Sequence, residues 1–428
     1  MVDEINPVFQ VFTFGFHPYA RSNPRKNKMK SDAIPGTVFI QTILVFYICV
    51  IDFPSRFSVF SLSASAVITL LVATTLVLIY SNLVIFHLIK KSSLSTVSGF
   101  KPGRLVVFYL VLTVFLFGIL GSNFNINTQQ NLTCYVIIFT SYFLGKRMHT
   151  GFDFYSVLQR VQIAILFSSI LYITTCVNYG TGNDFIYFPR AIAMISCLGI
   201  GITFYLTEQK SVVKFLYQSV FLGSVLLSLS RTAIFVAGVT FFALTVWKSR
   251  KQLLATLISL TTFFILAYSI FLLPVVHNRF SFIGDQATFG GRTINTSGRT
   301  KIWRVIMQES SDSIFFGHGI GSSEDLVLNN FQTISQPHND FLRIFFDFGL
   351  LGFLVLCLII LLFGLDGRAR PNLTFANSSV FKIKTVLALQ LFIFMLTDNP
   401  IVYPFYTLPL FFIVGVMSNH TYSQRSLE

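Results

Sequence analysis

The chain contains 428 residues, of which 53% are hydrophobic and only 11% are charged. A soluble globular domain carries about 25% charged residues, so this composition, with its mean hydropathy of +0.70, excludes that class of protein. The net charge of +14 does not by itself indicate nucleic-acid binding. In a membrane protein, basic loops that face anionic lipid headgroups account for such a charge.

Long apolar runs divide the sequence. A run of about 20 apolar residues crosses a bilayer as a helix, because a helix satisfies its own backbone groups in hydrocarbon. The runs are continuous, which favours helices over barrel strands. The sequence therefore predicts an all-α, polytopic transmembrane helical bundle. The predicted spans, about 12 in number, are 36–53, 60–88, 105–121, 131–145, 161–178, 190–207, 212–229, 232–247, 252–275, 341–363, 383–397 and 401–418.

The domain organisation follows from these runs. The N-terminal stretch carries Asp3 and Glu4 and does not resemble a cleavable signal peptide. In chain order, we expect a cytoplasmic N-terminal tail (1–35), spans 1–9 (36–275), one large outer loop between spans 9 and 10 (276–340), spans 10–12 (341–418) and a cytoplasmic tail (419–428).

Lysine and arginine are distributed unequally over the predicted loops. Alternate loops hold basic clusters such as Lys90 with Lys91 and Lys146 with Arg147, which places both termini in the cytoplasm. On the opposite, outer side, every basic residue except Lys301 is an arginine. These arginines are Arg56, Arg190, Arg231, Arg279, Arg292, Arg299, Arg304 and Arg343.

The outer arginines are candidate binding residues, because the planar guanidinium fork binds a diphosphate or carboxylate at two points. Arg231 has apolar sequence on both sides, and a charge so close to hydrocarbon needs a partner or a water-filled cavity. Arg190 stands at the outer start of a span. Arg299 begins a stretch typical of an interfacial amphipathic helix, with Trp303 as its anchor. For Arg343, pairing with headgroups or aspartates is an equally good interpretation.

Two motifs lie near the end of the outer loop. The alternating glycines of Gly317–Gly321 predict tight turns and close backbone approach, and the absence of a Gly-Lys-Ser/Thr ending argues against a nucleotide-phosphate loop. The second motif centres on His338, which follows a proline and precedes Asn339 and Asp340, two side chains able to orient its ring. We therefore expect His338 to be catalytic and His318 to be a loop residue.

Taken together and in order, these motifs resemble the O-antigen ligase and O-antigen polymerase superfamily of bacterial polysaccharide assembly. The layout of about 12 spans with one large outer loop near the C-terminus is similar too. The resemblance covers the C-terminal half by motif and the N-terminal third by topology only. The residues that carry it are Leu229-Ser230-Arg231-Thr232, Arg299 through Trp303, Gly317 through Gly321, Pro337 through Leu342 and Phe348 through Gly352.

The resemblance implies a metal-independent, inverting glycosyltransferase of the bacterial inner membrane, without a cofactor, whose active site faces the periplasm. Its donor would be an oligosaccharide on undecaprenyl diphosphate. His338 would act as the general base on the acceptor hydroxyl. Arg190, Arg231 and Arg299 would bind the diphosphate and stabilise its developing charge. Supporting residues would be Asn339, Asp340 and Trp303. Membrane lipid and a chain-length regulator would be partners, and nucleic acid would not.

Other chemistries stay open. A metal-dependent transferase needs acidic ligands in an early outer loop, where the first such loop offers only Asp52. The five cysteines all fall in predicted spans, so neither a disulfide framework nor a zinc site is indicated. An inverting glycosidase would use Asp340 and Asp398 as paired carboxylates. A flippase for the same lipid-linked glycan would also need helices and arginines, but internal repeats typical of transporters are not evident.

Within the superfamily, polymerase and ligase cleave the same donor bond and differ in their acceptor. The sequence favours a polymerase, because residues 338–343 (His-Asn-Asp-Phe-Leu-Arg) and 397–400 (Thr-Asp-Asn-Pro) are more similar to extracellular polysaccharide polymerases. A ligase that transfers glycan to lipid A-core is the alternative.

Overall fold

Helices predominate in the computed structural model. It describes residues 58–59, 62–63, 73–79, 102–123, 125–147, 154–183, 185–206, 211–246, 261, 286–289, 292–295, 298–332, 336–365 and 375–423. The strands in this part of the chain form two antiparallel hairpins, of Ser58–Val59 (β1) with Leu62–Ser63 (β2) and of Gln286–Phe289 (β3) with Arg292–Asn295 (β4). The prediction of a helical fold is confirmed.

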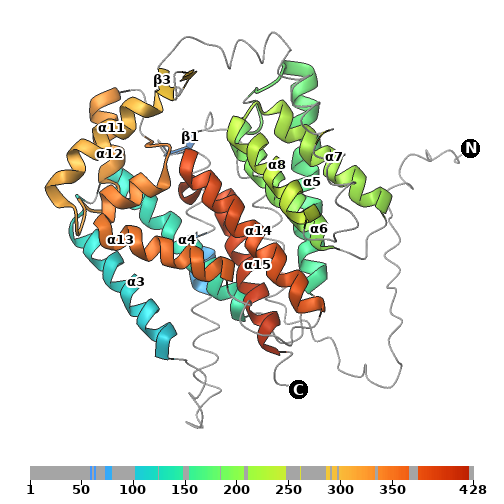
Figure 1. The fold of residues 1–428 in the computed structure, drawn as a ribbon, viewed down its shortest axis with the longest axis horizontal. Coiled ribbons are helices and arrows are strands. Elements are labelled where there is room, and N and C mark those ends of the chain that lie inside the picture. Colours follow the sequence, from blue (N-terminus) through green and yellow to red (C-terminus); the bar gives the residue numbers. More distant parts are fainter. Residues whose placement is uncertain are drawn as a thin grey trace, which may run out of the picture.

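The helices form two groups with a pair between them. In Figure 1, α5 to α8 lie on one side, α3, α11, α12 and α13 lie on the other, and α14 and α15 run between the groups. The helices are α3 (Pro102–Leu120), α4 (Ile126–Arg147), α5 (Phe154–Tyr179), α6 (Pro189–Tyr205), α7 (Ser211–Leu227), α8 (Arg231–Val246), α11 (Arg299–Glu309), the 3-10 turn η3 (Ser310–Ser313), α12 (Ser322–Phe331), α13 (Asp340–Leu365), α14 (Phe375–Thr397), the 3-10 turn η4 (Pro400–Val402) and α15 (Pro404–Ser423).

The predicted spans that fall on described residues coincide with helices. Two stretches, Tyr155–Tyr179 of 25 residues and Asp340–Leu362 of 23 residues, are long and apolar enough to cross a membrane, and the other apolar helices of the described part are shorter. This arrangement is compatible with embedding in a membrane. The N-terminal tail, spans 36–53 and 252–275 and most of span 60–88 lie outside the described residues, so the number of spans stays a prediction.

Small residues let some helices approach closely. A Cβ atom on Gly145 of α4 would meet the carbonyl oxygen of Phe412 on α15, and one on Gly415 of α15 would meet the carbonyl oxygen of Tyr142 on α4. Close contact through glycine is typical of helix pairs in membranes, where van der Waals packing rather than the hydrophobic effect holds helices together. Because α15 follows η4 directly, this contact fixes the turn at 398–402 against α4.

The glycine motif joins the long polar segment (residues 276–340) to the bundle. Gly317, Gly319 and Gly321 all have positive φ, and a Cβ on Gly319 would meet the backbone of Gly121 at the end of α3. Opposite them, α13 is kinked at Gly349 (φ 68°, ψ −167°). The predicted tight turns and close backbone approach are confirmed, and they place the segment before α13 in a fixed position.

Candidate functional site

His338 is held in an uncommon backbone conformation immediately before α13. Its φ is 55°, in the left-handed region that costs a non-glycine residue on the order of 1 kcal/mol. Trp303 Nε1 donates a hydrogen bond to the carbonyl of Pro337 at 3.0 Å. Asn339 donates from Nδ2 to the carbonyl of Leu396 at 3.1 Å, and its Oδ1 accepts from the amide of Leu342 at 3.0 Å, as a helix N-cap does. Contacts on both sides therefore fix the histidine.

The ring of His338 lies beside one carboxylate and one guanidinium group. Asp398 Oδ1 is 3.8 Å from His338 Nδ1, and Arg190 Nη1 is 3.4 Å from the same nitrogen. Arg190 Nη1 is also 3.9 Å from Asp398 Oδ1. Asp398 is almost fully buried, with 2% of its side chain exposed, whereas the exposed fraction is 17% for His338 and 45% for Arg190. The ring therefore stands between a buried acid and the surface.

Electrostatics keep Asp398 ionised. Burial alone would raise the pKa of this carboxyl group, but the interaction with His338 and the charges of Arg190 and Arg299 lower the pKa below its ordinary value. The acid is also fixed in place: its Oδ1 accepts from the amide of Asn399 at 3.0 Å. Asp398 is thus a permanent negative charge directed at the ring.

The three predicted arginines come from the beginnings of three helices. Arg190 lies in the first turn of α6, Arg231 is the first residue of α8, and Arg299 is the first residue of α11. The start of α8 is tied to the end of α14 by a hydrogen bond of 2.8 Å between Thr232 Oγ1 and Thr397 Oγ1, which brings Arg231 next to the Asp398 turn. Helix N-termini carry partial positive charge, so the backbone adds to the positive field of these arginines.

Arg299 joins this group through electrostatics rather than through a tight ion pair. Burial lowers the pKa of its guanidinium; Asp398 opposes that shift, and the nearby charges of Arg190 and Arg231 add to it. Among the described residues, its buried Nε has no hydrogen-bond partner. The structure therefore brings together all three predicted arginines and His338, with a single buried carboxylate between them.

The sequence did not predict that Asp398 would lie next to the imidazole ring of His338. We expected Asn339 and Asp340 to orient the imidazole, but Asn339 caps α13, and Asp340 accepts from the amide of Ile401 at 2.9 Å. The signal that was present is the polar run from Thr397 to Pro400, which on the sequence alone supported only the similarity to polymerases and a pair of Asp398 with Asp340. Pairing across the fold, between residues 60 positions apart, is not visible in sequence spacing.

Comparison with known proteins gives a family match for part of the chain. Residues 216–357 match a family model described as O-antigen ligase. The resemblance drawn from the sequence motifs is confirmed over this stretch, which contains Arg231, Arg299 and His338, whereas Arg190 and Asp398 lie outside it. A search of curated proteins gives no match to the chain. Members of this family are membrane-integral, glycosyltransferase-like enzymes of O-antigen assembly that act on lipid-linked polysaccharides.

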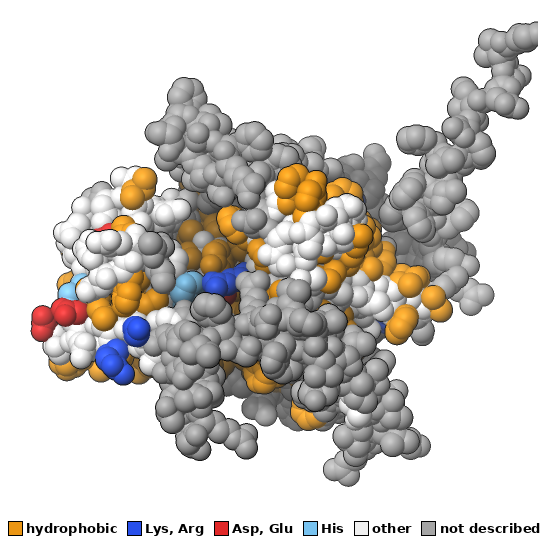
Figure 2. Space-filling view, turned by 90° about the horizontal axis from the view of Figure 1, so that it is seen from above, with side chains coloured by type: hydrophobic (Ala, Val, Ile, Leu, Met, Phe, Trp, Pro, Cys, Tyr) orange, Lys and Arg blue, Asp and Glu red, His pale blue; other side chains and the backbone are white. Residues whose placement is uncertain are grey.

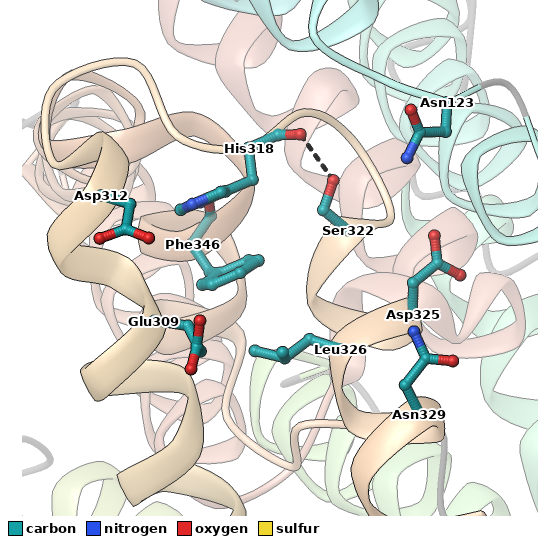
Figure 3. A pocket seen from close by; sticks show the side chains of 9 residues that line it. All are labelled: Asn123, Glu309, Asp312, His318, Ser322, Asp325, Leu326, Asn329 and Phe346. Carbon is teal, nitrogen blue, oxygen red and sulfur yellow. Dashed lines mark hydrogen bonds between the residues drawn. The ribbon is translucent and has the colours of Figure 1, made fainter.

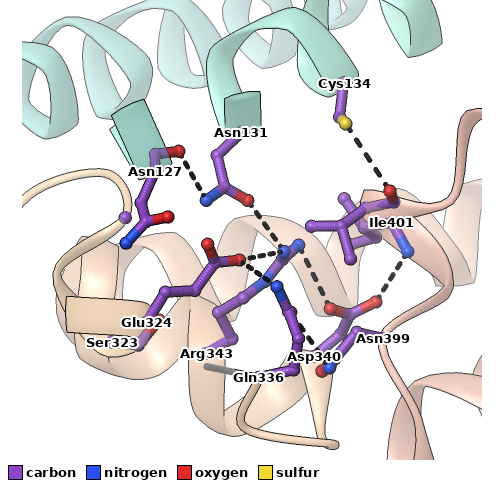
Figure 4. Close-up of polar contacts among 12 residues, drawn as sticks. Asn127, Asn131, Cys134, Ser323, Glu324, Gln336, Asp340, Arg343, Asn399 and Ile401 are labelled. Carbon is purple, nitrogen blue, oxygen red and sulfur yellow. Dashed lines mark hydrogen bonds and ion pairs between the residues drawn. The ribbon is translucent and has the colours of Figure 1, made fainter. Parts of the chain in front are cut away.

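A buried ionic cluster lies at the start of α13 (Figure 4). Arg343 is fully buried; its Nη2 is 3.1 Å from Asp340 Oδ1, and its Nη1 is 3.8 Å from Glu324 Oε1. Nη1 also donates to Asn131 Oδ1 on α4 at 2.9 Å. Arg343 therefore neither extends to headgroups nor joins the other arginines, because the acids that neutralise it are inside the fold. Burial raises the pKa of Glu324 to about 7, although Arg343 opposes that shift.

A second histidine lies in an acidic setting. A pocket of about 360 Å³ is lined by nine residues: Asn123, Glu309, Asp312, His318, Ser322, Asp325, Leu326, Asn329 and Phe346 (Figure 3). The ring of His318 stacks on Phe346 with a centroid distance of 4.2 Å. Three carboxylates and no Lys or Arg occur among these described lining residues.

The surface separates the two kinds of charge. Figure 2 shows histidine side chains in two settings: beside a hollow near the middle of this face they adjoin Lys and Arg side chains, and at one end of the face they adjoin Asp and Glu side chains. An anionic substrate is attracted to the first setting and repelled from the second. The arginine and His338 region is therefore the better candidate for binding a diphosphate.

Proposed function

We propose that the protein transfers a glycan from undecaprenyl diphosphate to an acceptor hydroxyl, with His338 as the general base. One observation carries this proposal: His338 lies between the buried carboxylate of Asp398 and Arg190, and Arg299, itself close to Arg231, interacts electrostatically with the same carboxylate. A base oriented by an acid, next to an anion-binding group, is what transfer from a diphosphate donor requires.

The chemical roles follow from this geometry. The mechanism uses the tautomer in which Nδ1 carries the proton and faces Asp398 instead of accepting from Arg190. The Nε2 lone pair of His338 then takes the proton from the acceptor hydroxyl. The acceptor oxygen then forms its bond to the anomeric carbon on the face opposite the diphosphate, and the bond from that carbon to the diphosphate oxygen breaks. The electron pair stays on the diphosphate, where guanidinium groups stabilise it. The configuration at the anomeric carbon is inverted.

The arginines also account for substrate binding without a metal. Within the described part of the chain, the buried Nε of Arg299 has no hydrogen-bond partner, and Asp398, Arg190 and Arg231 are close enough to shift the pKa of its guanidinium. Two-point bonds from guanidinium to phosphate oxygens supply both charge and direction. We therefore retain a metal-independent and cofactor-free mechanism as part of the proposal.

The location is proposed from the charge distribution in the sequence. Both termini lie in the cytoplasm, the long polar segment lies on the periplasmic face of the bacterial inner membrane, and spans flank it on both sides. The helices that carry the arginines all begin next to His338, so one face of the membrane holds the whole site. Asn339 and Trp303 support His338 through its backbone neighbours.

Two acceptors of the glycan fit this chemistry. We favour a polymerase that extends lipid-linked repeat units, with a chain-length regulator as a partner, because the motif around His338 and the Thr397–Pro400 turn are more similar to polymerases. The family match, which is described as O-antigen ligase, supports transfer to lipid A-core as the second candidate. A glycosidase is disfavoured, because Asp340 is fully buried and paired with Arg343 instead of facing Asp398 across a substrate.

The test reconstitutes the purified protein in lipid nanodiscs with undecaprenyl diphosphate-linked repeat units as the only glycan. We expect a ladder of longer glycans and release of undecaprenyl diphosphate, both lost in His338→Ala and retained in His318→Ala. Single transfer that needs added lipid A-core would establish the ligase instead. Full activity of His338→Ala, or no transfer with either acceptor while the lipid-linked glycan crosses the bilayer, would contradict the proposal and return weight to a flippase.

A further inference from the structure

Gln336 connects the buried ionic cluster to the region around His338. It lies two residues before His338, and its side chain makes two hydrogen bonds to different parts of the fold (Figure 4). Nε2 donates to Glu324 Oε1 on α12 at 3.1 Å, and Oε1 accepts from Asn399 Nδ2 at 3.2 Å. Asn399 is the residue next to Asp398. The side chain of Gln336 thus links the segment that carries His338 to the turn that carries Asp398.

Two further bonds join the same two segments. Asn339 Nδ2 donates to the carbonyl of Leu396, and Asp340 Oδ2 accepts from the amide of Ile401. The segment 336–340 is therefore attached to the segment 396–401 at three points, one before His338 and two after it. The ring of His338 and the carboxylate of Asp398 lie between these points, so the attachment sets the distance between them.

The cluster supplies a rigid support for this attachment. Glu324 is 2% exposed and faces Arg343 from α13, Gln336 from the segment before α13, and Asn131 from α4. Arg343 in turn contacts Asp340. The side chains that hold Gln336 and Asp340 are thus fixed by buried partners on α4, α12 and α13.

We propose that Glu324 and Gln336 are positioning residues: the carboxylate of Glu324 holds the amide of Gln336, which holds the His338 segment against Asn399 and so keeps the imidazole directed at Asp398. The inference rests on the proposed function of His338. Its reason is geometric, because His338 has a left-handed backbone that relaxes once its neighbours are released, and a displacement of about 1 Å can cost a reaction on the order of a hundredfold in rate.

The first test replaces Gln336 by leucine, which keeps the size of the side chain and removes both hydrogen bonds. The probe is the undecaprenyl diphosphate-linked repeat unit, and the release of undecaprenyl diphosphate is measured at several donor concentrations. We expect kcat to fall between about tenfold and a hundredfold while KM stays within about twofold, because the arginines are untouched. Gln308→Leu, at an exposed position of α11, is the matched control and should keep both constants.

The second test exchanges the two partners. Gln336→Glu places a carboxylate against Glu324, and the repulsion should lower kcat at least as much as leucine does. In the double variant with Glu324→Gln, the amide at position 324 donates to the carboxylate at position 336. Asn399 can still donate to residue 336. We expect the double variant to recover to within about threefold of the original kcat. A merely structural role would give loss of folded protein in the single variants without a change in the kcat of the protein that remains folded.

The outcomes separate the two proposals. An inactive His338→Ala together with an unchanged kcat in Gln336→Leu would overturn the positioning role and leave the catalytic role of His338 in place. An active His338→Ala would overturn both. Recovery of kcat in the exchanged pair, measured per folded protein, supports the positioning role, because the rate then follows the hydrogen bond and not the amount of folded protein.

Discussion

Two of the protein's histidines, His338 and His318, differ in almost every respect in their surroundings. His338 faces the buried acid Asp398 and lies among arginines, whereas His318 stacks on Phe346 at the edge of a pocket lined by carboxylates. His338 follows a proline, which restricts the backbone, whereas His318 follows a glycine with positive φ. The comparison teaches that the groups brought in from distant helices, rather than the local motif, decide which histidine can act on an anionic substrate.

The largest expected effect is the loss of the base. His338→Ala should lower transfer by about a thousandfold or more, because the acceptor hydroxyl loses its proton acceptor. The measurement is single-turnover release of undecaprenyl diphosphate from saturated protein. Monodisperse elution in detergent serves as the control for folding, and it should be unchanged, since the side chain of His338 contributes little packing.

Next in size is the change of Asp398 to asparagine. The amide keeps the volume but removes the charge, and its N–H group favours the ring tautomer in which Nε2 carries the proton and cannot accept another. We expect transfer to fall about a hundredfold to a thousandfold. Binding of the donor, measured by the donor concentration at half-maximal rate, should change little. A variant as active as the original would show that the ring does not depend on this acid.

Replacing Arg231 by lysine tests whether its guanidinium group binds the diphosphate. Arg231→Lys keeps the charge and loses the two-point fork, so transfer should fall about tenfold to a hundredfold. Lys301→Arg, at an exposed position of α11, is a control for changing one basic side chain into the other, and it should be neutral. Equal rates for lysine and arginine at position 231 would mean that this residue only supplies charge.

The glycines near His318 should affect stability. Gly319→Ala places a Cβ against the backbone of Gly121 at a φ of 97°, so the unfolding temperature should fall clearly, with a cost on the order of 3 kcal/mol. Gly298→Ala is the matched control: its φ of 85° is equally unfavourable, but nothing lies within 4 Å of the added atom. It should cost on the order of 1 kcal/mol. Equal losses would show that the close approach at Gly319 is not needed.

The smallest expected effect completes the comparison. His318→Ala should leave transfer within about twofold, because an acidic pocket does not attract a diphosphate and the ring stacks on Phe346 away from Asp398. The same ladder assay measures it. A loss as large as that of His338→Ala would break the distinction drawn between the two histidines.

Much of this arrangement was predictable from the sequence, and some of it was not. The helices at the predicted spans, the close approach at Gly319 and the family all follow from local patterns, since apolar runs and glycine spacing are properties of neighbouring residues. The partner of His338 and the burial of Arg343 do not, because both depend on which distant helices meet. From the sequence, Arg343 at the start of a predicted span is interpreted as a surface charge. Only the structure shows that Asp340 and Glu324 lie next to it inside the fold.

The pairing of Asp340 with Arg343 also bears on how the protein is made. An arginine that enters the bilayer alone on a helix costs about 2.5–3.5 kcal/mol at the membrane centre during insertion. Here the neutralising acid lies one turn away on the same helix, so the two charges meet as soon as that turn forms. Ile401, the later partner of Asp340, is synthesised only after α14. If α13 is a membrane span as predicted, the pair neutralises its charge before the rest of its final surroundings exist.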